Sequence, residues 1–436
     1  MILVDTALKQ RAATANPIRV GLVGAGYQGR GIALQLLTAV PGIRLVAIAN
    51  RTLPRARAAY TQVQGTSAEH VRTVAALEQA VAAGRYAVTE APDLLCRAAG
   101  IDAIIEATGT FEFAAQVALT AIEHGKHLIL SNAELDATLG PILKVYADRA
   151  GVVFTDIDGD QPGSMMNLHR FVSTIGYRPV LVGNVKGLLD HHRTPATQEA
   201  WARAHGQAPH MAASFADGTK ISMENAVAAN ATGFPVHERG MIGPRCTHVT
   251  EAADLYPHDA LLDTGLTDYV IGAEPGPGVF VIAHNDHPVK RRYAAVLKMG
   301  EGPFYVFYTP YHLPHLEVPL TVARAVCFGD ATVAPLGAPV CHVLTMAKRD
   351  LQPGDVLDGL GGFCAYGWID NADVAYRDRL LPFGLSEGAV LTRPVARGEA
   401  IAFDDVRLPA GRLIDHLWRE QMAYFGQDMP RTTAVR

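Results

Sequence analysis

One stretch near the N-terminus decides the fold: residues 18–29, which read IRVGLVGAGYQG. Its first half, Ile18–Val23, is a continuous apolar run of the kind that a parallel sheet buries on both faces. Its second half is a Gly-x-Gly-x-x-Gly phrase, and apolar residues at helical spacing follow it from residue 32 to residue 40. A strand, a glycine-rich turn and a helix in this order are typical of a unit that binds a dinucleotide.

The glycines of this phrase and the residues between them are the first predicted cofactor contacts. Gly24 would make the tight turn, Gly26 would let the backbone approach the pyrophosphate, and Gly29 would allow the helix to pack closely on the strand. Tyr27 and Gln28 lie at the start of the helix, where free backbone N–H groups bind an anion. The alternative is a plain glycine-rich turn without a ligand.

The end of the second predicted strand, residues 44–49, bears on the choice of cofactor. Sites for NAD usually place an acidic residue here to bind the ribose 2′-hydroxyl. This chain has Asn50 and Arg51 instead, and a guanidinium group suits a 2′-phosphate. We therefore predict NADP, with NAD as the alternative if Arg51 is only a solvated charge beside the site.

Three further residues follow later strands of the same predicted sheet. Thr108 and Gly109 end the strand at 101–107, and Asn132 follows the strand at 127–130. Carboxyl ends of strands face the ligand crevice in open α/β sheets, so we predict all three near the nicotinamide. Ordinary turn chemistry is the alternative for Asn132.

The alternation of strand and helix patterns continues to about residue 160 and predicts an α/β fold. We predict three domains: a Rossmann-type doubly wound parallel sheet (1–160), an α+β catalytic domain (161–334) and a small β-rich domain (335–436). The middle domain is expected to contain a helix at 219–231 and strands at 279–283 and 293–299.

Composition excludes several classes of protein. Hydrophobic residues make up 49% and charged residues 19% of the 436, which argues against disorder. The net charge of −5 is spread without long blocks, which argues against a nucleic-acid partner. No apolar stretch is long enough for a membrane span, and five scattered cysteines form no CxxC pair. With no secretory signal expected either, the sequence favours a cytoplasmic protein with a small-molecule substrate.

Acidic residues alternate at the end of the last predicted Rossmann strand. Asp156, Asp158 and Asp160 have a spacing of two, which places them on one side of an extended chain. Three carboxylates on one face repel one another unless a cation, arginine side chains or raised pKa values reduce the repulsion. Asp158 and Asp160 are therefore candidate ligands for Mg²⁺ or Mn²⁺, and Asp160 is also a catalytic candidate; a hydrogen-bonded turn is the alternative.

The middle domain supplies the other catalytic candidates. Lys186 ends an apolar strand and could protonate a substrate carbonyl as hydride arrives. Glu224 lies among small apolar residues of a predicted helix, where burial would raise its pKa and suit it to acid–base work. The alternatives are a solvated lysine and a salt bridge from Glu224 to Lys220.

Candidate substrate-binding residues lie in the same domain: Arg193, Asn225 and Asn230. A basic group near carboxylates suits a carboxylate or phosphate substrate.

Three stretches together resemble a known group of proteins: residues 20–29, 96–109 and 125–132. They are similar to the predicted homoserine dehydrogenase group, whose members have a Rossmann domain, a middle domain and a C-terminal SAF domain. One branch is similar to 1-deoxy-D-xylulose 5-phosphate reductoisomerase and has a Gly-Asp-Glu-Pro-type phrase where this chain has Gly159-Asp160-Gln161-Pro162.

The resemblance implies an NADP-dependent oxidoreductase with a SAF-like tail in a homo-oligomer. For the substrate we predict a small polar oxo or hydroxy compound that carries a phosphate or carboxylate. The predicted activity has two versions. One is a metal-dependent reductoisomerase, and the other is a metal-independent dehydrogenase of a hydroxy acid or homoserine-like compound. A sugar-binding SAF protein without catalytic activity is the remaining alternative.

Overall fold

The computed structural model describes residues 2–426, which form two compact units. Within the described residues, unit 1 comprises residues 2–136, 143–171 and 309–334, and unit 2 comprises residues 137–142, 172–308 and 335–426. Among the described residues, no helix has both the length and the apolar character that a membrane crossing needs.

Unit 1 is built on a seven-stranded sheet in the order β3-β4-β2-β1-β5-β6-β7, with all neighbours parallel. The strands are β1 (Ile18–Val23), β2 (Ile43–Ala49), β3 (Ala68–His70), β4 (Tyr86–Thr89), β5 (Ala103–Glu106), β6 (His127–Leu130) and β7 (Phe154–Asp156). The core strand β1 is buried except at Arg19. This burial explains the continuous apolar run that the sequence shows there.

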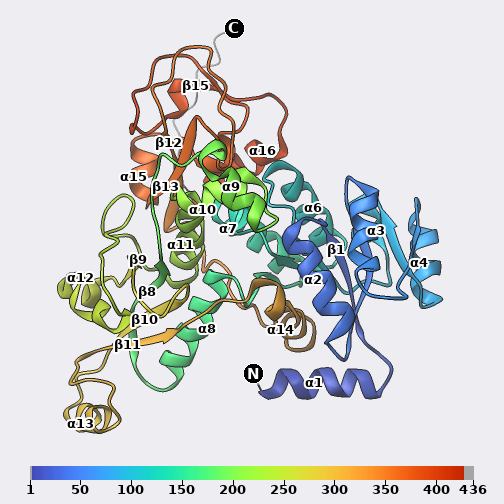
Figure 1. The fold of residues 1–436 in the computed structure, drawn as a ribbon, viewed down its shortest axis with the longest axis horizontal. Helices are drawn as coiled ribbons and strands as arrows, with labels where there is room; N and C mark the ends of the chain where they lie inside the picture. The colour runs from blue at the N-terminus through green and yellow to red at the C-terminus, as the bar shows by residue number, and fades with distance from the viewer. Residues whose placement is uncertain (1, 427–436) are drawn as a thin grey trace. The chain divides into compact units, whose positions relative to one another are not determined.

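Helices flank the parallel sheet (Figure 1). The helices that lie wholly or largely in this unit are α1 (Ile2–Ala13), α2 (Tyr27–Thr38), α3 (Leu53–Thr61), α4 (Val74–Ala82), α5 (Pro92–Arg97), α6 (Glu112–Glu123), α7 (Ala133–Ala150), α8 (Gln161–Thr174) and α14 (Pro314–Phe328). The order of strands reverses at β1, since β2 lies on one side of it and β5 on the other. The crevice for a ligand in such sheets is found at this switch point.

Unit 2 contains a four-stranded mixed sheet in the order β11-β10-β8-β9. Its strands are β8 (Arg178–Lys186), β9 (Leu266–Ile271), β10 (Val279–His284) and β11 (Phe304–Thr309). Two small antiparallel sheets follow: β12 (Cys341–Ala347) with β13 (Ala365–Asn371), and β14 (Val390–Leu391) with β15 (Val406–Arg407). The helices of this unit are α9 (Pro195–Ala204), α10 (Pro209–Ala216), α11 (Thr219–Thr232), α12 (His258–Asp263), α13 (Pro288–Val296), α15 (Ala372–Arg377) and α16 (Leu413–Tyr424), with short 3-10 helices at Val249–Asp254, Phe383–Leu385 and Phe403–Asp405.

The predicted α/β fold is confirmed, with a Rossmann-type parallel sheet, a second mixed sheet and small β elements near the C-terminus. The three-domain division and the SAF-like assignment of the tail stay predictions.

One predicted strand is wrong. Residues 293–299 contribute to helix α13 and the turn after it. His287 caps this helix, because its Nδ1 accepts hydrogen bonds from the backbone N–H groups of Val289 and Lys290. Pro288 at the first helical position removes one N–H group that would otherwise need a partner. These N-terminal signals outweigh the β-propensity of Tyr293 and Val296.

Candidate functional site

The glycine-rich turn of unit 1 has the geometry that the sequence predicts. Gly24 has a φ of 106°, and a Cβ atom there would lie 2.6 Å from the carbonyl oxygen of Ala107. A Cβ on Gly29 would collide with the carbonyl oxygen of Gly24, so α2 approaches the turn closely. Around Gly26 nothing lies within 4 Å of the corresponding position. The turn therefore presents open backbone at the first residues of a helix, where N–H groups are free to bind an anion.

Two side chains of this turn face different surroundings. Tyr27 is 52% exposed, whereas the amide nitrogen of Gln28 is buried without a hydrogen-bond partner among the described residues. Asn50 reaches the turn from the end of β2: its Oδ1 accepts the N–H of Ala25 at 3.0 Å, and its Nδ2 donates to the carbonyl of Thr52 at 2.9 Å. Asn50 thus fixes the turn, while the neighbouring Arg51 is exposed.

The ends of β5 and β6 are joined by a buried carboxyl group that the sequence reasoning did not assign. Glu106 accepts hydrogen bonds from the N–H of Thr108 at 2.9 Å and from Nδ2 of Asn132 at 2.7 Å. Burial raises the pKa of Glu106 to about 7. Asn132 also caps α7, since its Oδ1 accepts the N–H of Leu135. These contacts are those of a structural turn and helix cap, which was the alternative to a cofactor contact at Asn132. Gly109 has a φ of 65° in the same loop.

Asp158 has an arginine as its counter-charge. Its Oδ1 accepts from Arg324 and from Asn167, each at 2.7 Å, and its Oδ2 accepts from the hydroxyls of Thr321 at 2.8 Å and Thr332 at 2.7 Å. Both oxygens are therefore saturated by donors from the chain itself. These residues do not fit a divalent cation at Asp158, and the described residues hold no group of three or more acidic, histidine or cysteine side chains that suits a metal. For Asp160, Oδ1 accepts the N–H of Gln161 at the start of α8.

Asp136, in the first turn of α7, is a further buried acid of unit 1. It is fully buried, and neither carboxylate oxygen has a hydrogen-bond partner among the described residues. Desolvation raises its pKa from 3.8 to about 8. Between these two values the folded chain keeps a proton that the unfolded chain has released, so this group makes the free energy of unfolding fall as pH rises.

We expect Asp136→Asn to remove that part of the pH dependence. Relative to the wild type, the variant should gain up to about 1.4 kcal/mol of stability per pH unit between pH 5 and pH 8. Denaturant unfolding followed by circular dichroism across this pH range measures the difference. Asp148→Asn is the matched control, because Asp148 lies on the same helix but is exposed beside Lys144. Parallel pH profiles for wild type and Asp136→Asn would contradict the expectation.

Unit 2 gathers polar residues of β8 and α11 into a cluster that we call the lysine–glutamate cluster: Asn184, Lys186, Glu224 and Asn225. Alternate residues of a strand point to the same side, so Asn184 and Lys186 both face the helix. Glu224 Oε2 accepts from Lys186 Nζ at 3.4 Å and from Asn184 Nδ2 at 3.3 Å. The side chains of Lys186 and Glu224 are only 16% and 5% exposed.

Asn225 extends this cluster into the interior. Its Nδ2 donates to Asn184 Oδ1 at 3.1 Å, and its Oδ1 is buried without a partner among the described residues. The hydroxyl of Ser222 on the same helix is likewise buried and unpartnered there. Unused hydrogen-bonding capacity of this kind suits a polar ligand or a buried water molecule.

The two other predicted substrate residues are separately engaged in unit 2. Asn230 Oδ1 accepts the N–H groups of Val340 at 2.7 Å and Cys341 at 3.1 Å, so it anchors the start of β12. Arg193 pairs with Asp190 at 2.9 Å and keeps about a third of its side chain exposed. Their roles in substrate binding stay predictions.

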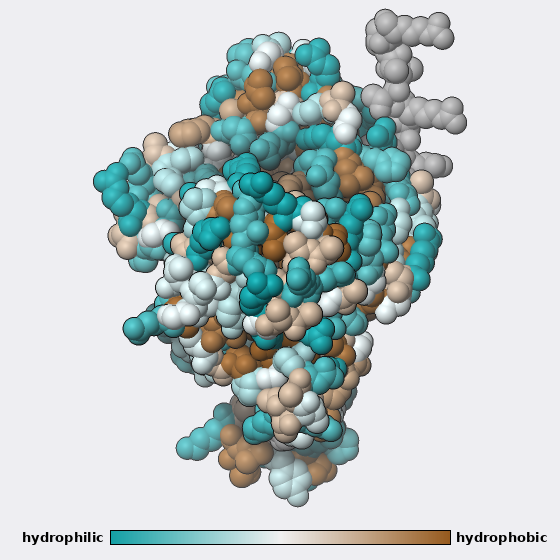
Figure 2. Space-filling model, turned by 90° about the vertical axis from the view of Figure 1, so that its right-hand side faces the viewer, coloured by the Kyte–Doolittle hydropathy of each residue, from teal (hydrophilic) through white to brown (hydrophobic). Residues whose placement is uncertain are grey.

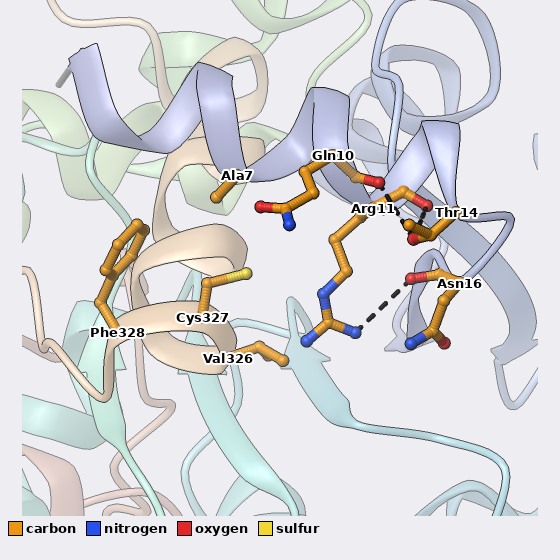
Figure 3. A pocket seen from close by; sticks show the side chains of 8 residues that line it. All are labelled: Ala7, Gln10, Arg11, Thr14, Asn16, Val326, Cys327 and Phe328. Atoms are coloured by element: carbon orange, nitrogen blue, oxygen red, sulfur yellow. Dashed lines mark hydrogen bonds between the residues drawn. The ribbon is translucent and has the colours of Figure 1, made fainter.

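A hollow lies beside α1 and the last turn of α14 (Figure 3). It is lined by Ala7, Gln10, Arg11, Thr14, Asn16, Val326, Cys327 and Phe328. Arg11 reaches the carbonyl of Asn16 at 3.5 Å. Because α1 leads into the amino end of β1, this hollow lies away from the carboxyl ends that carry the glycine turn.

Comparison with known proteins supports an enzymatic role. Residues 159–318 match a family model described as the catalytic domain of oxidoreductase DRL, over somewhat more than a third of the chain. The match begins at Gly159 and includes the lysine–glutamate cluster. This segment is therefore similar to the catalytic domain of an oxidoreductase family. No curated protein matches the chain.

Three of the similar solved structures are dehydrogenases. A homoserine dehydrogenase from Thiobacillus denitrificans is 16% identical, with a TM-score of 0.42 and coverage of 76% of this chain and 83% of that one. A scyllo-inositol dehydrogenase from Lactobacillus casei, solved with NAD(H) and scyllo-inositol, is 16% identical, with a TM-score of 0.35 and coverage of 61% and 73%. A myo-inositol 2-dehydrogenase from Lactobacillus plantarum is 14% identical, with a TM-score of 0.35 and coverage of 62% and 75%.

Proposed function

We propose that this chain is an oxidoreductase that uses a nicotinamide dinucleotide and acts on a small polar oxo or hydroxy compound. The observation that carries the proposal is the glycine turn at the switch point of the parallel sheet, where Gly24 meets the loop after β5. The match of residues 159–318 to an oxidoreductase catalytic domain supports the proposal that the chain catalyses a redox reaction.

The residues of the chain suggest how the reaction would proceed. A bound nicotinamide supplies or accepts hydride. In the direction of reduction, the ammonium group of Lys186 would donate the proton that the carbonyl oxygen needs to become a hydroxyl. Glu224 Oε2 accepts from that ammonium group at 3.4 Å and from Asn184 Nδ2 at 3.3 Å, so both side chains converge on one carboxylate oxygen. In the direction of oxidation, the neutral amine would take the same proton back.

The metal-independent dehydrogenase is the version that the contacts favour. Both oxygens of Asp158 accept hydrogen bonds from the chain, and Arg324 neutralises its charge. A reductoisomerase that needs a divalent cation at Asp158 gains no support from this arrangement. We retain a phosphate or carboxylate group on the substrate as part of the proposal, since Arg193 remains partly exposed.

For the cofactor we propose NADP rather than NAD. No carboxylate follows β2 to bind a ribose 2′-hydroxyl, because Asn50 stands there with both ends of its side chain engaged by backbone groups. The exposed guanidinium group of Arg51 is the adjacent donor for a 2′-phosphate.

The first test is the binding of NADPH and NADH, followed by the fluorescence of the reduced nicotinamide. We expect NADPH to bind more tightly than NADH, and Gly24→Ala to weaken the binding of both at least about tenfold, a free-energy loss of roughly 1.4 kcal/mol. The added methyl group would collide with Ala107 and would strain a φ of 106°.

Gly84→Ala is the matched control for backbone strain. Gly84 has a φ of 70°, but the nearest atom to an added Cβ is a side-chain nitrogen of Arg44 at 3.6 Å. Equal losses in both variants, or no binding of either nucleotide by the wild type, would contradict the proposal. Tighter binding of NADH than of NADPH would contradict only the proposal that Arg51 binds the 2′-phosphate of NADP. Consumption of NADPH with a panel of small oxo acids and keto-sugar phosphates then identifies the substrate.

A further inference from the structure

A histidine–glutamate pair lies at the carboxyl ends of β3 and β4, outside the predicted cofactor contacts. His70 ends β3, and Glu90 directly follows β4. His70 Nε2 and Glu90 Oε2 are 2.8 Å apart, and Nε2 carries the hydrogen because an ionised carboxylate only accepts hydrogen bonds. The side chain of Glu90 is 49% exposed, and its Oε1 has no hydrogen-bond donor among residues 2–426. This oxygen can therefore accept a hydrogen bond from a ligand.

The strand before Glu90 lies beside β2, which leads into the predicted NADP site. Strands β2 and β4 are parallel with Ala49 opposite Thr89, and the N–H of Asn50 donates to the carbonyl of Thr89 at 3.0 Å. Asn50 and Glu90 are thus the first residues after two neighbouring strands, which lie about 5 Å apart in a sheet. Sites for NAD place an acidic residue after β2, and here a carboxylate follows the next strand instead.

A tight turn fixes the backbone around Glu90. Thr89 Oγ1 accepts the N–H of Ala91 at 3.2 Å, and Pro92 opens α5 directly afterwards. Proline at this position is already in a helical conformation and leaves no N–H group without a partner. The turn therefore holds the carboxylate at the edge of the sheet that carries the glycine turn.

Three basic residues flank the pair in the chain. Arg51 and Arg55 follow β2 and Arg72 follows β3; all three are exposed and form no ion pair within residues 2–426. Helices α3 and α4, which connect these strands, lie on the right in Figure 1, and Figure 2 turns this side to the viewer, with many hydrophilic residues in teal across it. Guanidinium groups suit a phosphate, whereas the carboxylate of Glu90 suits a hydroxyl group.

We propose that Glu90 determines how strongly the chain discriminates between NADH and NADPH, an inference that rests on the proposed binding of a nicotinamide dinucleotide. Glu90 accepts the ribose 2′-hydroxyl of NADH and repels the 2′-phosphate of NADPH, while Arg51 attracts that phosphate. His70 holds the carboxylate through Oε2 and leaves Oε1 for the hydroxyl. Specificity depends on repulsive contacts as well as attractive ones. The chain therefore binds both nucleotides, and Glu90 limits its preference for NADPH.

The test measures the dissociation constants of NADH and NADPH for the wild type and for Glu90→Gln by the fluorescence of the reduced nicotinamide. Glutamine keeps the size of the side chain but carries no charge, so NADH should bind more weakly and NADPH more tightly. The dissociation constant of NADH divided by that of NADPH should rise at least about tenfold. No substrate is needed, so binding is measured separately from catalysis.

Glu69→Gln is the matched control. Glu69 precedes His70 in β3, its side chain is 35% exposed, and it pairs with Arg85 at 3.0 Å. Neighbouring residues of a strand point to opposite faces of the sheet, so this variant removes one negative charge on the face away from His70. Its ratio of dissociation constants should stay within about twofold of the wild-type ratio, because solvent and salt screen an exposed charge at a distance.

Circular dichroism checks the folding of both variants, and Glu90→Ala replaces Glu90→Gln if the glutamine variant does not fold. An unchanged ratio after the loss of Glu90 would overturn the proposal, even if both nucleotides bound more weakly, because the residue would then only shape the edge of the sheet. An equal change of the ratio in Glu69→Gln would overturn it as well. Binding of neither nucleotide by the wild type would overturn the proposed function itself, and this inference with it.

Discussion

Replacing Lys186 by methionine is expected to lower kcat by about two to four orders of magnitude, the usual contribution of a positioned proton donor. Methionine keeps most of the length of the side chain but cannot transfer a proton. The expectation follows from the enclosed position of Lys186, whose ammonium group lies 3.4 Å from Glu224 and is 16% exposed. Steady-state kinetics with the substrate found by the NADPH assay measures the loss.

Binding and folding must be separated from chemistry in this variant. NADPH should bind Lys186→Met as it binds the wild type, since the predicted cofactor contacts lie in unit 1. Lys9→Met is the matched control: Lys9 also pairs with a carboxylate, Asp5, but is 72% exposed on α1. An unchanged kcat in Lys186→Met would show that another group donates the proton.

Asp160→Asn distinguishes the two versions of the mechanism. If activity depends on Lys186 alone, the asparagine variant keeps its kcat; if the acidic segment takes part in catalysis, kcat falls. A combined loss in both variants would assign a role to each residue, and a double variant would then report whether the two effects are independent.

The sequence predicted the parallel sheet and the glycine turn because their signals are local. Strands β1 and β6 have the bounds that the sequence predicts, and Gly24 and Gly29 have the tight contacts that their phrase predicts. The hydrophobic pattern and the glycines lie within a dozen residues of one another, so no long-range information was needed. The error at 293–299 has a different cause. The apolar residues there lie on the exposed side of a helix and not in a buried strand, and the residue that caps this helix, His287, lies six residues before Tyr293.

The partners of the candidate side chains could not be predicted, because they come from distant parts of the chain. Alternating aspartates predicted that Asp158 needs a counter-charge, and arginine was among the possibilities. Nothing in the sequence pointed to Arg324, which lies 166 residues further on. The same holds for Glu224 and Lys186, 38 residues apart on a helix and a strand whose packing only the fold determines. Glu106 had a detectable signal, an acidic residue at the end of an otherwise apolar strand.

The second large effect concerns stability, and it lies in a buried ion pair of unit 2. Lys348 directly follows β12, its side chain is 2% exposed, and the side chain of its partner Asp217 is fully buried. The three protons of the ammonium group have three acceptors: Asp217 Oδ2 at 2.8 Å and the carbonyls of Arg193 and Gly362 at 2.9 and 2.8 Å. The pair therefore joins the C-terminal strands to the segment before α11.

We expect Lys348→Met to lower the free energy of unfolding of unit 2 by about 3–5 kcal/mol, because it leaves the carboxylate of Asp217 buried without its counter-charge. The double variant Lys348→Met with Asp217→Asn should recover part of this loss. Asparagine removes the charge but keeps an oxygen for the N–H of Thr219, which Asp217 binds at 2.9 Å. Lys9→Met provides the exposed comparison, with an expected loss of less than about 1 kcal/mol.

Tryptophan fluorescence measures this effect selectively, because all three tryptophans lie in unit 2: Trp201, Trp368 and Trp418. Denaturant titrations followed at these residues report the unfolding of that unit without a signal from unit 1. If the double variant is no more stable than Lys348→Met, the cost arises from lost packing of the lysine stem or from the two unpaired carbonyls. If the double variant recovers most of the lost stability, the unpaired charge of Asp217 is the cause, as expected when one partner of a buried ion pair is removed.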